Sequence, residues 1–263
     1  MRPTFGGPQS MTATMGHLPY GYLLVPALLL LATSCKKDDE PPAAVSGNSV
    51  PSYPSTVVDI DGNVYFVVSI GDQRWMAENL RTTHYADGTE IPLGVDPISW
   101  TAAGTSSTPA RCAYQHNATN AATYGYLYNW YAVTNPHGIC PQGWHVPTDA
   151  EWQYLIVSLG ADASTMDGVA QNVGGRLKST STLWQQPNFG ATNTSGFSGL
   201  PGGYRNGGSG DFSALGYFGI WWSIDPGNNP DIAWYMRLNH DYVGVSRSSL
   251  SKSYGYCVRC LQD

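Results

Sequence analysis

The residues with the clearest capacity to bind a ligand lie in one short loop near the end of the chain. Residues 224–231 read Ile-Asp-Pro-Gly-Asn-Asn-Pro-Asp and directly follow two tryptophans. Carboxylate and amide oxygens suit Ca²⁺, and exposed aromatic faces suit stacking against a ligand. The sequence therefore predicts a ligand site, with Ca²⁺ as the candidate ion and no other cofactor, at Trp221, Trp222, Asp225, Asn228, Asn229 and Asp231. The alternative is an ordinary Asn/Gly/Pro turn.

A second candidate position is the glycine-rich segment around Tyr204 and Arg205. Residues 201–210 read Pro-Gly-Gly-Tyr-Arg-Asn-Gly-Gly-Ser-Gly, which is too rich in glycine to be regular throughout. Two interpretations remain open for Tyr204 and Arg205. They are exposed ligand-binding side chains, or they belong to the start of a buried strand.

Patterns typical of catalysis are absent from the sequence. It contains no G-x-S-x-G, H-E-x-x-H, P-loop or G-x-G-x-x-G motif. His145 lies between Trp144 and Val146, where a hydrogen-bonded structural histidine is expected rather than a base. Asp149 and Glu151 resemble an acid–base pair, but a role in capping a helix explains both. We therefore predict a protein that is not an enzyme and has no metal site other than the candidate Ca²⁺ position in the 224–231 loop.

The strongest predicted element is a helix that begins at Asp149. Thr148 and Glu151 have the spacing of a capping box, and Gly160 supplies a left-handed stop. Between them, apolar side chains recur at i, i+3, i+4 and i+7, at Trp152, Leu155, Ile156 and Leu159. A second helix is predicted over 118–133, where the same spacing is taken by Tyr124, Leu127, Tyr128 and Tyr131.

The remaining elements are predicted to be short strands and long loops. A β-hairpin is expected over 57–70, around the turn residues Asp61, Gly62 and Asn63. Further strands are expected at 74–79, 217–223, 233–238, 242–246 and 254–261. The region that follows the strand at 74–79, through Pro109, is expected to be a loop. No linker divides residues 56–263, so we predict one α+β domain with two helices and antiparallel strands.

The N-terminal region predicts export and lipid anchoring. Residues 21–34 form an apolar run that is too short to span a bilayer, as in a signal peptide. Leu31-Ala-Thr-Ser-Cys35 looks like a lipobox, so residues 1–34 would be removed and Cys35 acylated. Residues 35–55 are rich in proline and serine and predict a flexible tether. A net charge of −6 argues against a nucleic-acid partner.

Seven motifs, in this order, closely resemble the Fibrobacter succinogenes major paralogous domain. They begin with Asp59-Ile-Asp-Gly-Asn-Val-Tyr65, Trp75-Met-Ala-Glu-Asn-Leu80, Tyr124-Gly-Tyr-Leu-Tyr-Asn-Trp130 and Cys140-Pro-Gln-Gly-Trp-His-Val-Pro-Thr-Asp-Ala-Glu-Trp152. They end with Leu200-Pro-Gly-Gly-Tyr-Arg205, Trp221-Trp-Ser223 and Val258-Arg-Cys260. The resemblance covers nearly all of Val57–Leu261. It implies a secreted or lipoprotein module of Bacteroidota-like bacteria.

A more distant resemblance concerns the fold. Val146-Pro-Thr-Asp-Ala-Glu-Trp152 is similar to a segment of the formylglycine-generating enzyme superfamily, which implies a C-type-lectin-like fold. The reactive cysteines of those enzymes are replaced here by residues such as Leu250 and Gly255, so their activity is not expected. Asn229-Pro230-Asp231 faintly resembles the sugar-binding triplet of C-type lectins.

Four cysteines remain after Cys35, and an even number in an exported domain favours disulfides, with three connectivities open. The lectin-like resemblance implies a Cys140–Cys260 bond, because such folds join the helix to the terminal strand. Cys112 and Cys257 would then form the second bond, with a different partner for Cys112 as the alternative.

Together, these features predict an outer-membrane lipoprotein with a non-catalytic binding or adhesion domain. Lys36-Lys-Asp-Asp-Glu40 resembles an export tag and favours the cell surface, with a periplasm-facing position as the alternative. The expected partner is a glycan or a surface protein. The alternatives are an enzyme with a loop-built cleft acting on cell-wall or sulfated material, and a purely structural surface module.

Overall fold

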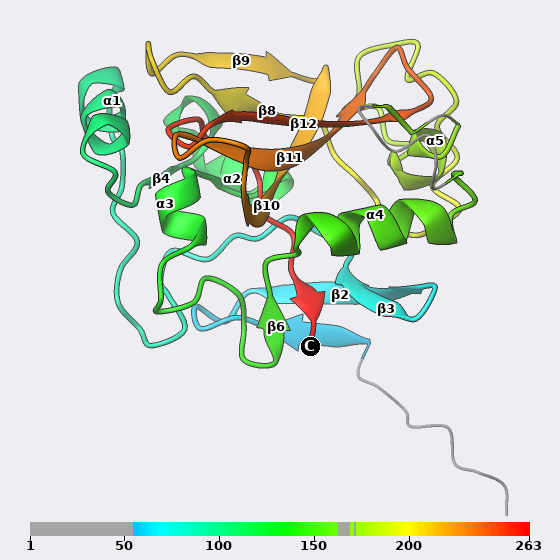
Figure 1. Cartoon of the computed structure of the whole chain (residues 1–263), viewed down its shortest axis with the longest axis horizontal. Coiled ribbons are helices and arrows are strands. Elements are labelled where there is room, and N and C mark those ends of the chain that lie inside the picture. The colour runs from blue at the N-terminus through cyan, green and yellow to red at the C-terminus, as the bar shows by residue number, and fades with distance from the viewer. Residues whose placement is uncertain (1–54, 163–168, 171) are drawn as a thin grey trace, which may run out of the picture. The chain divides into compact units, whose positions relative to one another are not determined.

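The computed structural model describes residues 55–162, 169–170 and 172–263 (Figure 1). The predicted signal peptide, Cys35 and nearly all of the tether lie outside these residues. No helix in the described part of the chain is both long and apolar enough to cross a membrane.

The first sheet joins segments from both ends and the middle of the chain. Its five strands are ordered β1-β2-β3-β13-β6: β1 (Thr56–Val58), β2 (Val64–Ile70), β3 (Gln73–Met76), β13 (Leu261–Gln262) and β6 (Trp144–His145). The predicted hairpin is confirmed, and the Asp59 carboxylate fixes its turn by accepting the N–H groups of Asp61 and Asn63 at 3.0 and 2.9 Å. Leu261 pairs with Trp75 on one side and His145 on the other.

The second sheet has the order β10-β11-β12-β7 and is antiparallel. Its strands are β10 (Phe218–Pro226), β11 (Ile232–Asn239), β12 (Val245–Ser251) and β7 (Val169–Ala170). Two small hairpins pair β4 (Arg111–Cys112) with β5 (Leu127–Tyr128) and β8 (Gly202–Arg205) with β9 (Phe212–Leu215). The strands predicted at 217–223 and 233–238 are confirmed. The strand predicted at 242–246 instead runs over β12. Of the strand predicted at 254–261, residues 255–257 form isolated bridges and Leu261 begins β13.

The predicted helix at Asp149 is confirmed as α4 (Asp149–Ser158). The Thr148 hydroxyl accepts the Glu151 N–H at 3.2 Å, and the Glu151 carboxylate accepts the Thr148 N–H at 2.8 Å. These two bonds satisfy N–H groups that the helix itself leaves free. Trp152, Leu155 and Ile156 are buried, as their spacing predicts.

The helix predicted over 118–133 is wrong. Two short helices, α2 (Ala118–Tyr124) and α3 (Trp130–Val133), flank β5. Gly125 ends α2 with φ +79°, and a Cβ there would lie 2.7 Å from the Leu80 carbonyl oxygen. The apolar spacing did predict burial of Tyr124, Leu127 and Tyr128, but these residues belong to different elements.

Other helices were not predicted. These are α1 (Pro97–Thr105), α5 (Gly174–Leu177) and the 3₁₀ helix η1 (Tyr114–His116). Asp96 caps α1 together with Ser99, which takes the place of the usual Glu or Gln at the third helical position. The sequence of α1 has no apolar stripe at helical spacing, and only Trp100 and Gly104 of this helix are buried. For this reason the sequence did not predict it.

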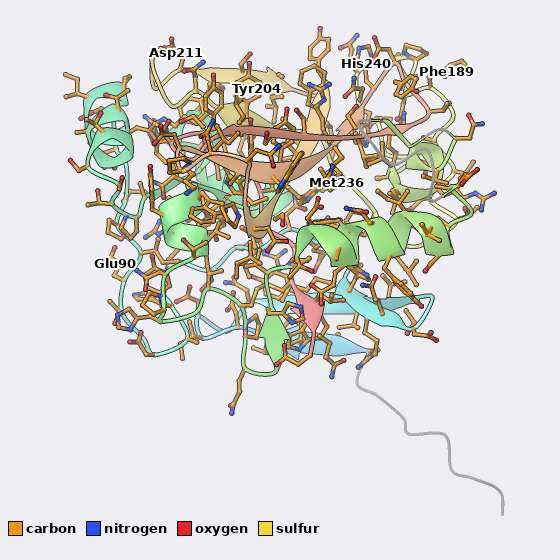
Figure 2. All side chains as sticks on the ribbon, viewed as in Figure 1. Glu90, Phe189, Tyr204, Asp211, Met236 and His240 are labelled. Carbon is orange, nitrogen blue, oxygen red and sulfur yellow. A yellow bond between two sulfur atoms is a disulfide. The ribbon has the colours of Figure 1, made fainter. Side chains whose placement is uncertain are left out.

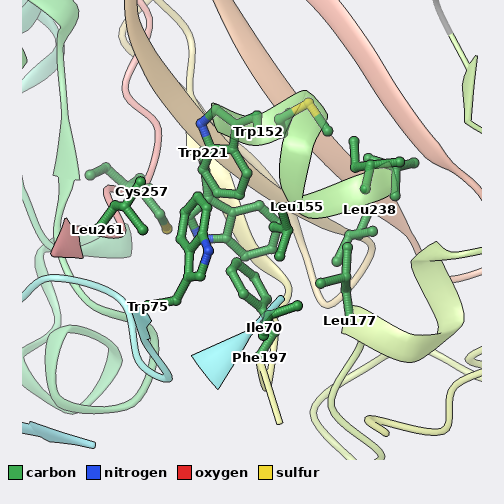
Figure 3. Close-up of a cluster of buried hydrophobic side chains, with 14 of the residues drawn as sticks. Ile70, Trp75, Trp152, Leu155, Leu177, Phe197, Trp221, Leu238, Cys257 and Leu261 are labelled. Atoms are coloured by element: carbon green, nitrogen blue, oxygen red, sulfur yellow. The ribbon is translucent and has the colours of Figure 1, made fainter. Parts of the chain in front are cut away.

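Strand β10 separates two clusters of buried side chains. Trp221 packs in the first cluster, where its ring centroid lies 5.6 Å from Phe197 and 6.5 Å from Trp152 (Figure 3). Trp222 points to the opposite side, into the second cluster, 4.4 Å from Tyr256. Neighbouring residues of a strand face opposite ways, so these adjacent tryptophans anchor both cores.

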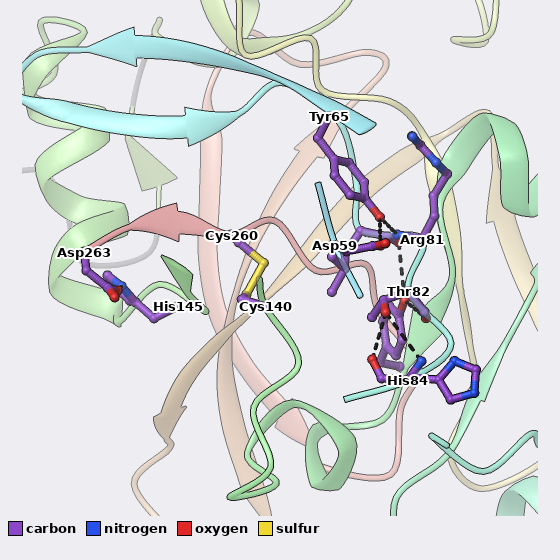
Figure 4. The surroundings of a disulfide bond; sticks show 11 residues. Asp59, Tyr65, Arg81, Thr82, His84, Cys140, His145, Cys260 and Asp263 are labelled. Atoms are coloured by element: carbon purple, nitrogen blue, oxygen red, sulfur yellow. Dashed lines mark hydrogen bonds and ion pairs between the residues drawn. A yellow bond between two sulfur atoms is a disulfide. The ribbon is translucent and has the colours of Figure 1, made fainter. Parts of the chain in front are cut away.

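The Cys140–Cys260 disulfide is confirmed and lies beside the pairing of β6 with β13 (Figure 4). The second predicted bond is wrong, because Cys112 and Cys257 are free and buried. The Cys257 thiol points at the Tyr124 carbonyl oxygen, 3.7 Å away. Burial raises the pKa of Cys112 to about 11 and that of Cys257 to about 12, so both thiols are protonated and unreactive at neutral pH.

His145 is a hydrogen-bonded structural histidine, as predicted. Its Nδ1 lies 2.6 Å from the Asp263 carboxylate and its Nε2 lies 3.0 Å from that of Glu151. Burial alone would lower the pKa of His145, but the bonds to Asp263 and Glu151 outweigh burial and raise it.

Folding stability should therefore depend on the charge of His145. A raised folded-state pKa adds stability that is fully present below the unfolded pKa, near 6.5, and is lost as the pH rises through the folded value. We expect His145→Gln to lower the unfolding midpoint more at pH 5.5 than at pH 8.5. An equal loss at both pH values would show that the imidazolium contributes nothing.

Candidate binding site

The predicted loop forms the end of β10 and the turn into β11, and its contacts are those of a turn. The Asp225 carboxylate accepts the Asp149 N–H at 2.7 Å and so helps to cap α4. Asn228, Asn229 and Asp231 are exposed, and the Asn229 side chain accepts the Asp231 N–H at 2.9 Å. Nowhere in the described ranges do three or more His, Cys, Asp or Glu side chains form a group that could hold a metal ion.

Trp221 and Trp222 cannot contact a ligand, and their predicted role is wrong. They are 1% and 0% exposed. The Trp221 indole N–H donates to the Asn79 side-chain oxygen at 2.7 Å, and that of Trp222 donates to the Tyr128 carbonyl at 2.8 Å. Two tryptophans beside a polar loop suggested a stacking platform, but their strand is covered on both faces.

Arg205 is also buried, which removes it from the predicted site. Its guanidinium donates to the carbonyls of Gly210 and Gly94 at 2.9 and 2.8 Å, between the rings of Trp100 and Phe212. The buried-strand interpretation is therefore correct for Arg205, which lies at the end of β8. Its neighbour Tyr204 faces the opposite side of the strand and is half-buried; Figure 2 shows where Tyr204 lies on the molecule.

Tyr204 belongs to a cluster of aromatic side chains that reaches the surface. Its ring centroid lies 5.9 Å from Tyr254, which is also half-buried, and 6.3 Å from Tyr256. Tyr235 lies 5.1 Å from Tyr256, which stacks in turn on Trp222. We call this surface the tyrosine face; its half-buried members are Tyr204, Phe218, Arg237 and Tyr254, and Tyr235 and Tyr256 are its buried floor.

The floor of the tyrosine face is rigid and uncharged. Burial raises the pKa of Tyr256 far above its usual range, and the phenols of Tyr235, Tyr254 and Tyr204 raise it further, whereas the nearby Arg237 opposes the shift. The Tyr256 phenol therefore remains a protonated hydrogen-bond donor. The Tyr254 hydroxyl accepts a bond from the Asn206 amide at 3.2 Å, which holds that ring in place.

Arg237 supplies the positive charge of the tyrosine face. It lies two residues after Tyr235 on β11, so both side chains point to the same side of the sheet. Its guanidinium carbon lies 5.1 Å from the centre of the Phe218 ring. No motif in the sequence pointed to Arg237, Tyr235 or Tyr254, although the alternation within the predicted strand 233–238 places Tyr235 and Arg237 on the same side.

A hollow of about 540 Å³ on another part of the surface is also polar. Its lining includes Asp61, Asn63, Glu78, Arg81, Thr83 and Tyr126. The Asp61 carboxylate already accepts bonds from the Thr83 N–H at 2.5 Å and from the Thr82 hydroxyl at 3.0 Å, and His84 Nδ1 lies 2.5 Å from it. Burial would raise the pKa of Asp61, but these bonds lower it to about 2. Asp61 is therefore occupied in holding the Thr82–His84 segment.

The fold and its surface define a class of protein: an α+β module of curled antiparallel sheets and short helices, with a disulfide that joins the segment before β6 to the residue before β13. Residues 68–262 match the family described as the Fibrobacter succinogenes major domain, and the chain belongs to this family. The resemblance predicted from the seven motifs is thereby confirmed. No curated protein and no solved structure matches the chain.

Proposed function

We propose that this protein is a lipid-anchored outer-membrane lipoprotein whose domain, residues 56–263, is a non-catalytic binding module for glycans. The tyrosine face is the proposed binding site, and a C-type-lectin-like arrangement is the proposed fold. The observation that carries the proposal is the half-buried Tyr204–Tyr254 pair, fixed on a rigid aromatic floor. Aromatic rings that are held in place stack on sugar rings at little cost in conformational entropy.

The chemistry of the tyrosine face favours a glycan over a protein surface as the partner. Serines lie next to this face on the sheet, because Tyr235 and Arg237 lie opposite Ser248 and Ser246 on β12. A sugar offers many hydroxyls and carbon–hydrogen faces, which suit such a mixture. Protein interfaces also use Tyr and Arg as anchors, so the panel of polysaccharides described below tests the glycan directly. The anchor at Cys35 and the tether would hold this site outside the membrane.

One observation favours the enzyme alternative. His84 Nδ1 lies 2.5 Å from the Asp61 carboxylate, and a carboxylate in this position orients the other ring nitrogen of a histidine for acid–base work. His84 also lines a small hollow of about 240 Å³ together with Thr82 and Asp59. If this site is catalytic, His84→Ala should abolish release of soluble products from cell-wall or sulfated polysaccharides while leaving glycan binding intact.

The proposed function is tested by binding of the whole oxidised chain to a panel of polysaccharides, with and without EDTA. We expect saturable binding that EDTA does not change, and we expect Tyr204→Ala or Tyr254→Ala to weaken it about tenfold, or about 1.4 kcal/mol. Tyr217→Ala is the matched control, because Tyr217 is 45% exposed and packs on His240, outside the tyrosine face.

Two results would contradict this proposal. Binding abolished by EDTA would point to a calcium lectin at Asp225, Asn229 and Asp231. No binding across the panel would leave a protein partner or a structural surface role.

A further inference from the structure

We propose that the ligand of the tyrosine face is an acidic glycan, and that Arg237 binds its anionic group. This inference rests on the proposed glycan-binding function and adds the class of sugar. Such a ligand carries a carboxylate or sulfate on a sugar ring. The anionic group would lie within reach of the Arg237 guanidinium while the ring stacks on tyrosine.

The first argument is that Arg237 has no acceptor. The Nε atom of Arg237 is buried without a hydrogen-bond partner. Its guanidinium makes one cation–π contact, with the Phe218 ring. Every other arginine within the described ranges has an oxygen partner. These partners are Gln262 for Arg74, Glu78 for Arg81, Glu90 for Arg111, Leu159 for Arg176, Gly210 for Arg205, Asp149 for Arg247 and Asn79 for Arg259.

The second argument is energetic. A desolvated donor without a partner costs free energy that a hydrogen-bonding ligand recovers. Guanidinium groups bind carboxylate and sulfate oxygens through paired N–H donors in a fixed geometry. An anionic group that enters beside Phe218 would therefore gain charge-assisted bonds from the half-buried guanidinium, which has no acceptor among the residues that the structure describes.

The third argument is the placement of Arg237 relative to the rings. It belongs to the same strand and the same side as Tyr235 and lies close enough to influence the pKa of Tyr256. The positive charge thus lies beside the stacking surface, which fits a ring that carries its own charge. The net charge of the chain is −6, so the attraction is local and should weaken with added salt.

The test uses the whole oxidised chain and three probes: polygalacturonate, its fully methyl-esterified form and dextran sulfate. We expect polygalacturonate to bind at least tenfold more tightly than its neutral ester. Arg237→Met should remove this difference and leave binding to the ester within twofold, and Arg237→Lys should restore part of it. Dextran sulfate distinguishes a site for carboxylates from one that also accepts sulfates.

The controls separate this proposal from the proposed function. Arg81→Met removes an arginine from the polar hollow and should leave binding unchanged. If Arg81→Met instead removes the preference for polygalacturonate over its ester, the binding site is the hollow. Equal affinity for the acid and its ester would overturn the role of Arg237 while preserving glycan binding. No binding of any probe would overturn both. An unfolding midpoint for each variant shows whether it is folded, and the comparison of acid with ester needs no variant.

Discussion

Asn79→Ala is expected to destabilise the domain by about 3–5 kcal/mol, the cost of leaving a buried charge and its neighbours unpaired. The Asn79 side chain is 3% exposed and joins three distant segments. Its oxygen accepts bonds from Trp221 at 2.7 Å and Arg259 at 2.6 Å, and its nitrogen donates to the Tyr124 carbonyl at 2.8 Å.

The severity of this change comes from Arg259. Its guanidinium is fully buried between Phe197 and Trp221, and it also donates to the Phe197 carbonyl. Burial lowers the pKa of Arg259 to about 9, which reflects the cost of desolvating the charge. Without the Asn79 oxygen, this cation would keep one carbonyl acceptor, and the Trp221 indole N–H would have none.

Thermal unfolding of Asn79→Ala should show a midpoint lower by roughly 6–20 °C, given about 2–4 °C per kcal/mol for a domain of this size. Asn228→Ala is the matched control, because Asn228 is exposed, and its midpoint should stay unchanged. A loss of less than about 1 kcal/mol for Asn79→Ala would show that water or another side chain replaces the amide.

Removing the disulfide should have a comparable effect. Cys140 and Cys260 are 120 residues apart, and for a loop of this length the chain-entropy account predicts about 5 kcal/mol. Measured losses for native disulfides run from about 2 to 5 kcal/mol. We expect the double substitution Cys140→Ser and Cys260→Ser to fall in that range in urea unfolding.

Reduction supplies the control for this prediction. The oxidised wild type should lose the same stability when dithiothreitol is added, whereas the double variant should not respond. Cys112 and Cys257 are free already, so they should contribute no response of their own. A response of the double variant to dithiothreitol would mean that Cys112 and Cys257 are bonded in solution.

The elements that the sequence predicted well are those whose signals are local. The capping box at Thr148 and Glu151 and the turn at Asp61–Asn63 both determine their structure within a few residues. The helix predicted over 118–133 is wrong for a non-local reason. Leu80, far away in the sequence, lies against the backbone of Gly125 and breaks the pattern there.

The candidate site was harder to predict for the same reason. Trp221 and Trp222 look like ligand-binding residues until the strand that carries them is seen to lie between two cores. The half-buried position of Tyr204 depends on Tyr254 and Tyr256, fifty residues later. That Arg237 has no acceptor follows from what surrounds it in three dimensions, which no spacing in the sequence encodes.

The place of β13 in the first sheet limits the order in which the chain can fold. As the chain is synthesised from its N-terminus, the edge of β3 stays open until Leu261 arrives to pair with Trp75 and His145. Cys140 likewise waits for Cys260 before it can be oxidised correctly. Open strand edges promote aggregation, and contacts of long sequence separation slow folding. A nascent chain of this protein should therefore depend on holding chaperones until Cys260 and Leu261 have emerged.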